Sequence, residues 1–466
     1  MNISNMRYVF ILYGFRYGEA FFICGLRIMK GEYTKMLVSI TVAVITCAAM
    51  ILSILFFPKL KIGKRSFDTY PLIVLSGAVI MLVLGQVSLG SVFGAFIADS
   101  AVNPLKILVL FICMTVLSVF LDAIGFFFYV ANVVLHKFGT SQKKLFLTLY
   151  ITVSVLTVFT SNDIIILTFT PFICYFCKNA RISPLPYLIA EFVAANTWSM
   201  ALMIGNPTNI YLSGSASIDF VEYFSVMWLP TLLCGIVSFI TLFLLFYKEL
   251  SKEMAKDMSR SHVFMNKPLL IIGLLHLGVC TVLLALGGYL GWEMWLISLI
   301  AVLSLIVCAL IVSKLQGKEP AALHTCLLRA PWTLIPFMLG MFVIVLALSE
   351  QGVTSLLCGF LAGGSPIIAY GVFSTLLDNV MNNIPMSVLM GSVVAESGSL
   401  AALYATVIGS NLGALLTPIG ALAGIMWGSM LKGQGVRMRY IDFLKNGIIV
   451  LIPALAASLF GLFLAL

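Results

Sequence analysis

Charged side chains are scarce in this chain of 466 residues, at 10% of the total. Soluble domains carry roughly 25% charged residues, so the scarcity argues against an ordinary soluble domain. Histidine is rarer still, with four in the whole chain and none spaced as zinc ligands. The sequence also lacks the motifs of ATP-binding loops, serine hydrolases and zinc peptidases. These absences leave nothing to support an ATPase, a hydrolase or a bound metal, and we expect no enzyme and no organic cofactor.

Long apolar runs recur along the whole chain. Hydrophobic residues make up 61% of the chain, and the mean hydropathy is +1.11. Runs of about 20 residues, enough to span the hydrocarbon core of a bilayer, occur at 37–57, 222–247, 268–287, 292–313 and 443–466. The sequence therefore predicts a multi-pass protein of the cell membrane, with the lipid bilayer as its main surroundings. Residues 1–36 carry scattered charges and no signal-peptide pattern, which indicates an N-terminal extension or an interfacial segment.

The net charge of +9 does not indicate a nucleic-acid partner. Lysine and arginine cluster in short loops between the apolar runs, as at 59–65, 137–144, 178–181, 248–267, 314–329 and 432–445. Loops rich in these residues stay in the cytoplasm. The charge therefore predicts which side of the membrane each loop occupies.

Two polar segments interrupt apolar stretches at matching places in the two halves. They are TSND at 160–163 and VMNNIP at 380–385. Within a membrane, irregular backbone persists only where protein buries it or where it lines a cavity, and paired interruptions point to the binding site of a transporter. The basic loops place the apolar arms of each segment on one side of the membrane. We therefore predict two re-entrant hairpins that enter from opposite sides.

Landmarks recur in the same order in both halves. Gly125 corresponds to Gly352, and Asn162 corresponds to Asn382, 220 positions later. Asn196 and Gly205 correspond to Asn411 and Gly420, both 215 positions later. We predict an all-α polytopic membrane protein of two inverted-topology repeats, each with a re-entrant hairpin and a broken transmembrane helix. The repeats are expected at 37–247 and 268–466, with a cytoplasmic linker at 248–267.

The broken helices are predicted at GNPTN (205–209) and TPIGA (417–421). Glycine permits unusual backbone angles, and proline starts a new helix without needing a donor. An interrupted helix exposes N–H groups at one end and C=O groups at the other, which suit anions and cations respectively. Together with the hairpin tips, these segments form the predicted substrate and ion site: Ser161, Asn162, Asp163, Asn196, Gly205, Asn206, Pro207, Thr208, Asn209, Asn382, Asn383, Pro385, Asn411, Thr417, Pro418 and Gly420.

Five carboxylates fall within apolar segments, where an ionisable group suggests function. They are Asp122, Asp163, Glu191, Glu350 and Asp378. Asp163 stands at a hairpin tip, where burial favours the protonated form and makes it usable as a proton carrier. Asp122 and Glu350 lie near matching breaks, so these three are the candidates for proton coupling. Glu191 is expected to pair with Lys178 or Arg181, and Asp378 to shape the second hairpin.

A family resemblance rests on five segments. These are FLDAIGFF (120–127), SNDIIILTFTPF (161–172), GNPTNI (205–210), MNNIP (381–385) and IGSNLGALLTPIGALAGIMW (408–427). Over roughly 37–466 the chain resembles the arsenite efflux permeases of the ion-transporter superfamily, which also holds sodium/proton antiporters and citrate or dicarboxylate carriers. The resemblance implies two inverted repeats around one central site, often in a homodimer. It departs at Asn196 and Asn411, where arsenite permeases usually carry an aspartate.

Three functions stay open from the sequence. The first is ion-coupled export of arsenite, antimonite or a related small anion, with neutral As(OH)₃ bound by amides and hydroxyls and with protons as the coupling ion. The second is a sodium-coupled carrier of a di- or tricarboxylate, or a sodium/proton antiporter, although the sequence suggests no arginine near the site. The third is a channel or receptor, which opposed re-entrant hairpins disfavour. Cys174 and Cys177 form a CxxC pair that suits soft metals, but we expect it to be dispensable.

Overall fold

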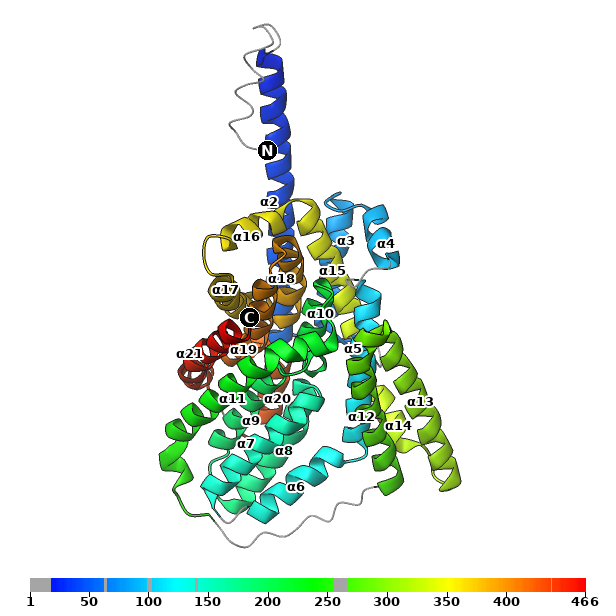
Figure 1. Cartoon of the computed structure of the whole chain (residues 1–466), viewed down its shortest axis with the longest axis vertical. Helices are drawn as coiled ribbons and strands as arrows, with labels where there is room; N and C mark the ends of the chain where they lie inside the picture. The colour runs from blue at the N-terminus through cyan, green and yellow to red at the C-terminus, as the bar shows by residue number, and fades with distance from the viewer. Residues whose placement is uncertain (1–17, 63–64, 99–102, 139–140, 255–265, 437) are drawn as a thin grey trace.

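The computed structural model describes residues 18–62, 65–98, 103–138, 141–254, 266–436 and 438–466. Almost all of them are helical (Figure 1). Nine helices of the described residues are long and apolar enough to cross a membrane. Hydrophobic side chains form one continuous buried core, and many others stay exposed on the outside, as a lipid-facing surface requires.

The described residues of the first half form ten α-helices and a short 3₁₀ turn, besides the strands given below. They are α2 (Gly18–Phe56), α3 (Thr69–Val83), α4 (Leu89–Ile97), α5 (Pro104–Ala123), α6 (Phe126–Phe138), α7 (Gln142–Phe159), α8 (Asn162–Ala180), α9 (Leu185–Trp198), η1 (Met203–Gly205), α10 (Pro207–Ser215) and α11 (Phe220–Leu250).

The second half repeats that order. It contains α12 (Lys267–Leu290), α13 (Met294–Leu315), α14 (Ala321–Arg329), α15 (Leu334–Glu350), α16 (Val353–Leu361), α17 (Pro366–Met381), α18 (Asn383–Ser397), α19 (Leu400–Leu412), η2 (Gly413–Leu415), η3 (Pro418–Gly420), α20 (Leu422–Gly433) and α21 (Tyr440–Ala465).

Helices ten labels apart play the same part in the two halves. Helix α3 packs against α15, and α13 packs against α5; α10 packs against α18, and α20 against α8. The final helices α11 and α21 pack along each other. In Figure 1, α6 to α8 lie toward the lower end, whereas α16 to α18 lie toward the upper end. This reciprocal packing is the arrangement that an inverted repeat predicts.

The interruptions lie where the sequence predicts them. Helices α7 and α8 flank residues 160–161, and α17 and α18 meet at Asn382. Helix α5 ends just before Gly125 and α15 just before Gly352, and both glycines have positive φ angles, of 83° and 77°. A residue with a side chain is strained in that conformation, which explains why glycine marks both breaks. The chain between α9 and α10 is also non-helical, as is the chain between α19 and α20, apart from short 3₁₀ turns.

Three details differ from the prediction. A short antiparallel pair of strands, β1 (Lys59–Ile62) and β2 (Arg65–Asp68), follows α2. The sequence did not predict this pair, because strands of four residues give no periodic signal. The basic segment expected to be a loop at 314–331 contains α14. Helix α2 passes through residue 36 without a break, so the expected N-terminal extension joins the first repeat through one helix. Residues 1–17 of that extension and 255–265 of the expected linker lie outside the described residues.

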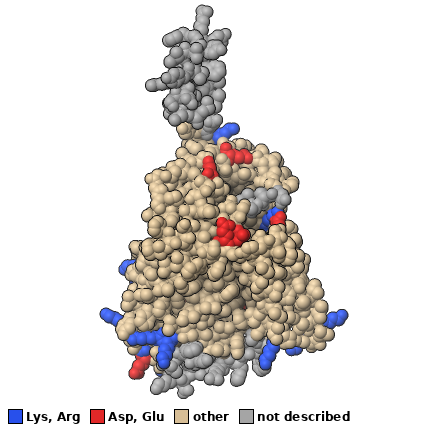
Figure 2. Space-filling model, viewed as in Figure 1, with Lys and Arg blue, Asp and Glu red and all other residues tan. Residues whose placement is uncertain are grey.

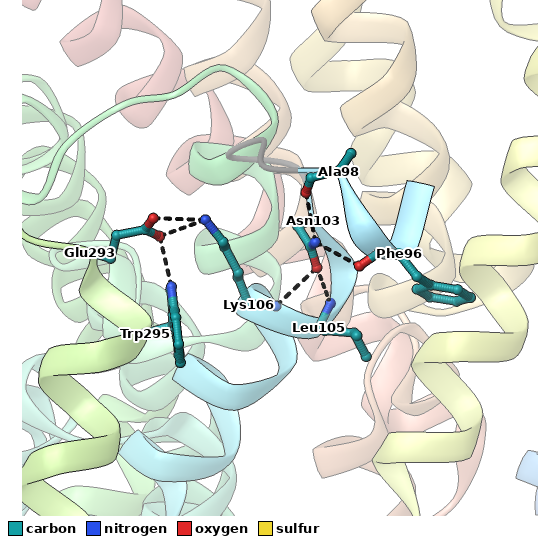
Figure 3. A network of polar contacts seen from close by, with 7 residues as sticks. All are labelled: Phe96, Ala98, Asn103, Leu105, Lys106, Glu293 and Trp295. Atoms are coloured by element: carbon teal, nitrogen blue, oxygen red, sulfur yellow. Dashed lines mark hydrogen bonds and ion pairs between the residues drawn. The ribbon is translucent and has the colours of Figure 1, made fainter. Parts of the chain in front are cut away.

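The outer helices of the two halves are joined by a polar network (Figure 3). Asn103 caps α5 by accepting from the backbone N–H groups of Leu105 and Lys106, and its amide donates to the carbonyls of Phe96 and Ala98. Lys106 then forms an ion pair with Glu293 at the start of α13, with Nζ 2.8 Å from Oε1. This network holds the beginning of α5 against the second half.

Charge separates along the long axis of the molecule. On the face shown in Figure 2, Lys and Arg gather mostly along the lower end, and few charges interrupt the middle. The lower end is also where α6 and α8 end and where α12 begins in Figure 1. The positive-inside rule therefore assigns this end to the cytoplasm.

Candidate functional site

A cavity of about 880 Å³ lies beside the tip of the first hairpin. Ser161 and Asp163 line it, and they are the members of the predicted site that do so. The opposite wall is one face of α5, made by Phe111, Thr115, Val119 and Asp122. Lys59 of β1 and Arg329 of α14 are among the other residues that line the cavity. Because both come from basic segments, the cavity faces the side assigned to the cytoplasm.

The first hairpin tip is tied to its broken helix. Thr160 and Ser161 are extended, and α8 begins at Asn162. The side-chain amide of Asn162 donates to Oδ1 of Asn196 on α9 at 3.1 Å, and its own Oδ1 accepts from the backbone N–H of Asp163 at 2.9 Å. Asn162 is buried, while Asp163 is half-buried beside the cavity. The tip therefore presents a carboxylate on a backbone that Asn162 holds in place.

The second tip is bound differently. Asn382 has φ 76° and ψ 155°, a conformation that only glycine adopts without strain. Its amide donates to the carbonyl of Ile419 in the break between α19 and α20, at 2.9 Å. Asn379, one turn earlier, donates to the carbonyl of Gly413 and accepts from the hydroxyl of Thr417, at 3.0 and 2.6 Å. Each hairpin tip thus bonds to the broken helix of its own half.

The two broken helices meet through their amides. Asn411 donates to Oδ1 of Asn209 at 2.7 Å, and its Oδ1 accepts from Asn206 and from the hydroxyl of Ser199, both at 2.9 Å. The hydroxyl of Ser410 donates to that of Thr208 at 3.2 Å. All six side chains are buried. Asn206, Thr208 and Asn209 therefore join the halves in this conformation and do not line the cavity.

Asn196 and Asn411 make the same local bond. Each donates its side-chain amide to the carbonyl four residues earlier, Phe192 and Val407, at 2.8 Å. The bond fixes each amide in the last turn of its helix. Both residues stand where the resemblance to arsenite permeases would place an aspartate. An amide both donates and accepts here, which a carboxylate does not.

The prolines and glycines of the predicted site shape the backbone. Pro207 is the first residue of α10, and Pro418 starts η3. A Cβ on Gly420 would lie 2.9 Å from Cα of Ala414, so only glycine fits there, and a Cβ on Gly205 would lie closer still to the backbone of Ser199. Pro385 and Asn383 are buried in the first turn of α18. These residues permit the breaks, whereas the polar side chains make the contacts.

The carboxylates divide into different environments. Asp122 lines the cavity, accepts from the hydroxyl of Thr168 at 2.7 Å and pairs with Arg329, with Oδ2 2.6 Å from Nη2. Glu350 is exposed at the end of α15, so its assignment to the apolar core is wrong. Glu191 is fully buried and accepts from the hydroxyl of Thr170 at 3.1 Å. Its expected pairing with Lys178 or Arg181 is wrong, because the described residues include no such ion pair.

Arg329 is the main residue that sequence reasoning missed. The sequence predicts that Arg329 lies in a cytoplasmic loop. In the structure it lies on α14 and lines the same cavity as Ser161 and Asp163. Its side chain is 50% exposed, so part of the guanidinium remains free for water or a solute. The expectation that no arginine lies near the site is therefore wrong. The one signal of this placement is that α14 corresponds to α4 in the repeat, since each is a short helix that precedes a long one.

Cys174 and Cys177 are both buried on α8, away from the residues that line the cavity. Their thiols lie among the side chains of the hydrophobic core. Within the part of the chain that the structure describes, no group of three or more His, Cys, Asp or Glu side chains is arranged to hold a metal ion.

Comparisons with known proteins agree with this architecture. The model of the citrate transporter family matches residues 69–403. The chain belongs to this family. It is also 26% identical over 409 residues to the arsenical pump membrane protein of Escherichia coli, covering 84% of this chain and 92% of that protein. The protein of the same name from Yersinia enterocolitica is 28% identical over 379 residues, covering 76% of this chain and 85% of its relative.

A solved structure shares the fold at low sequence identity. The YdaH transporter of Alcanivorax borkumensis, whose crystal structure revealed an unusual topology, superposes with a TM-score of 0.54 at 12% identity, over 92% of this chain and 98% of that one. The family and the relatives confirm the resemblance to arsenite permeases that the motifs indicate. The chain is a multi-pass secondary transporter of the cell membrane, and its family implies an anionic substrate.

Proposed function

We propose that the chain exports arsenite and antimonite from the cytoplasm in exchange for protons. The observation that carries the proposal is the opening of Ser161 and Asp163 into a cavity on the cytoplasmic side, while the second hairpin tip is buried. A solute loads from the cytoplasm in this conformation. Neutral As(OH)₃ requires hydroxyl and amide groups as hydrogen-bond partners, and side chains of both kinds are concentrated at the two hairpin tips and in the broken helices.

Proton exchange is assigned to Asp163 because it is the carboxylate at the tip that lines the cavity. In this conformation it reaches cytoplasmic water, and after the tip closes it would face the other side. Asp122 lines the same cavity, but Arg329 and Thr168 already hold it. It therefore serves as a fixed partner of the guanidinium. Glu350 is not proposed for coupling, because it lies exposed and outside the cavity.

A second function is favoured by a specific observation. Arg329 and Lys59 line the cavity with Ser161, and half of the Arg329 side chain is exposed. A guanidinium binds carboxylates in a bidentate manner. A sodium-coupled carrier of citrate or a dicarboxylate would use Arg329 and Lys59 to bind the carboxylates of its substrate. The match to the citrate transporter family supports this second function.

The experiment is transport by the purified protein in liposomes. Arsenite, citrate and succinate are tested as substrates under an imposed pH gradient and, separately, under an imposed sodium gradient. Flux of arsenite driven by the pH gradient supports the proposal. Flux of citrate or succinate that requires sodium, with no arsenite flux, would replace it with the second function. A homodimer, as the resemblance implies, is tested on the same samples by cross-linking and by light scattering.

A further inference from the structure

A stripe of buried oxygen atoms runs along α17 to the second hairpin tip. Ser374, Asp378 and Asn382 follow one another at intervals of four residues, so they share one face of the helix. Their side chains are at most 2% exposed. Among the described residues, the hydroxyl of Ser374, both carboxylate oxygens of Asp378 and Oδ1 of Asn382 have no hydrogen-bond partner.

The stripe continues past the tip onto α18. Oδ1 of Asn383 and the hydroxyl of Ser387, one turn later, are also buried without a partner among the described residues. Buried polar groups are nearly always paired, so a run of unpaired acceptors at one tip calls for an explanation. The first hairpin has no such run in the described residues, because Asn162 and Ser154 are both bonded there.

Asp378 lies within the stripe, and its carboxylate forms no ion pair with any of the described residues. The elements packed on α17 are α2, α16, α18, α19, α21, η2 and η3. The charged and titratable side chains described on these elements, together with Tyr370 of α17 itself, are Tyr33, Lys35, Cys47, Cys358, Glu396, Tyr404, Tyr440, Asp442 and Lys445. None of these side chains forms a hydrogen bond or an ion pair with Asp378. An isolated buried carboxylate is costly, so the group is neutral or holds a cation.

The packing leaves room for a proton in preference to a metal ion. A Cβ on Gly413 would lie 2.5 Å from Oδ2 and 2.5 Å from Cβ of Asp378, so the carboxyl group rests against the backbone at the end of α19. Gly409 lets α19 approach Ser374 in the same way, with an added Cβ 2.6 Å from Cβ of that serine. A proton takes up no space of its own beside this packed carboxyl group, whereas a sodium ion would have to fit between it and the other oxygens of the stripe.

We propose that Asp378 is a proton-binding site of the second repeat and acts with Asp163 of the first. The repeat offset places Asp378 opposite Val158 and Asp163 opposite Asn383, so each hairpin carries one carboxylate within a turn of its tip, on opposite arms. In this conformation Asp163 lines the cytoplasmic cavity, while Asp378 is sealed. Asp378 holds its proton while sealed and exchanges it when the second tip opens to the other side. This inference rests on the proposed coupling to protons.

The first measurement needs no substrate. Infrared spectra of the full-length protein in nanodiscs are compared for the wild type, Asp378→Asn, and the exposed control Asp442→Asn. The expected result is a band of a protonated carboxyl group that is lost in Asp378→Asn alone and is the same in sodium-free and sodium-containing buffer. A missing band in the wild type, or a band abolished by sodium, would overturn the proposal. Asp378→Ser serves in its place if Asp378→Asn does not fold.

The second measurement is proton movement in proteoliposomes containing a pH-sensitive dye, with arsenite, citrate or succinate, whichever the wild type transports. Asp378→Asn is expected to move fewer protons per substrate than the wild type while keeping substrate exchange. An unchanged proton count would overturn the carrier role and leave Asp378 as a structural acid. Failure of the arsenite assignment is seen separately, as wild-type flux of citrate or succinate only, and does not alter the infrared result.

Discussion

Asn411 donates a hydrogen bond to Asn209 across the interface between the two halves, with Nδ2 2.7 Å from Oδ1. The same side chain accepts from Asn206 and Ser199, so one amide joins three polar groups of the first repeat. All four residues are buried. Asn411 of α19 therefore makes most of the polar contact between the broken helices, and the bond from Ser410 to Thr208 adds to it.

Replacing Asn411 with alanine is expected to destabilise the protein. Each buried polar group left unpaired costs about 1–3 kcal/mol. The readout is the apparent Tm of the purified protein in detergent. Asn446→Ala is the control, since it removes one half-buried bond to the backbone of Asp442 and is expected to change the Tm little. A Tm for Asn411→Ala equal to that of the control would show that the network does not stabilise this state.

The amides of the two hairpin tips are expected to matter more than any cysteine. Asn162→Ala removes the bond to Asn196, and Asn382→Ala removes the bond to Ile419. We expect either change to abolish transport while the protein stays folded in the membrane, because water does not replace these buried contacts. The double change Cys174→Ser and Cys177→Ser is the control and should be nearly silent. Loss of flux in the cysteine variant, with the amide variants active, would contradict the central site.

The opposed hairpins give a prediction of accessibility. Single cysteines at Ser161 and Met381, on a background without native cysteines, are treated with membrane-impermeant thiol reagents. We expect Ser161→Cys to react from the cytoplasmic side, because it lines the cavity. Met381→Cys is expected to react from the outside, and more slowly, because position 381 is buried in this conformation. Labelling of both positions from one side only, in every condition, would rule out inverted repeats.

Sequence patterns predicted the breaks better than the contacts. Apolar runs interrupted by glycine, proline and asparagine locate both hairpins and both broken helices, because lipid tolerates such backbone only inside protein. The partners of Asn411 were not predictable, since they lie about 200 positions away and form only when the halves pack. Arg329 was missed for the same reason. Its charge marks a cytoplasmic segment, and only the fold brings that segment beside Asp163.

Arg329 separates the two candidate substrates. Arg329→Gln removes the guanidinium from the cavity and leaves Asp122 bonded to Thr168. Neutral arsenite does not need the charge, so we expect arsenite export to be largely kept. If a carboxylate is the substrate, its flux should fall by about tenfold or more, since a hydrogen bond to a charged group contributes about 1.5–3 kcal/mol. Lys106→Gln, which breaks an ion pair outside this cavity, is the control.

The last prediction concerns Asp163 and the direction of energy coupling. Its counterpart Asn383 does not titrate, so the first tip alone presents a carboxylate to the cavity. An amide at this position has nearly the same shape but carries no proton between the two sides. We therefore expect Asp163→Asn to lose transport driven by a pH gradient and to keep exchange of substrate across the membrane. The measurement is flux under an imposed pH gradient, compared with flux under an imposed sodium gradient. Strict dependence on sodium without a response to pH in the wild type would reject the proton-carrying role, because the carboxylate would then serve to neutralise a bound sodium ion.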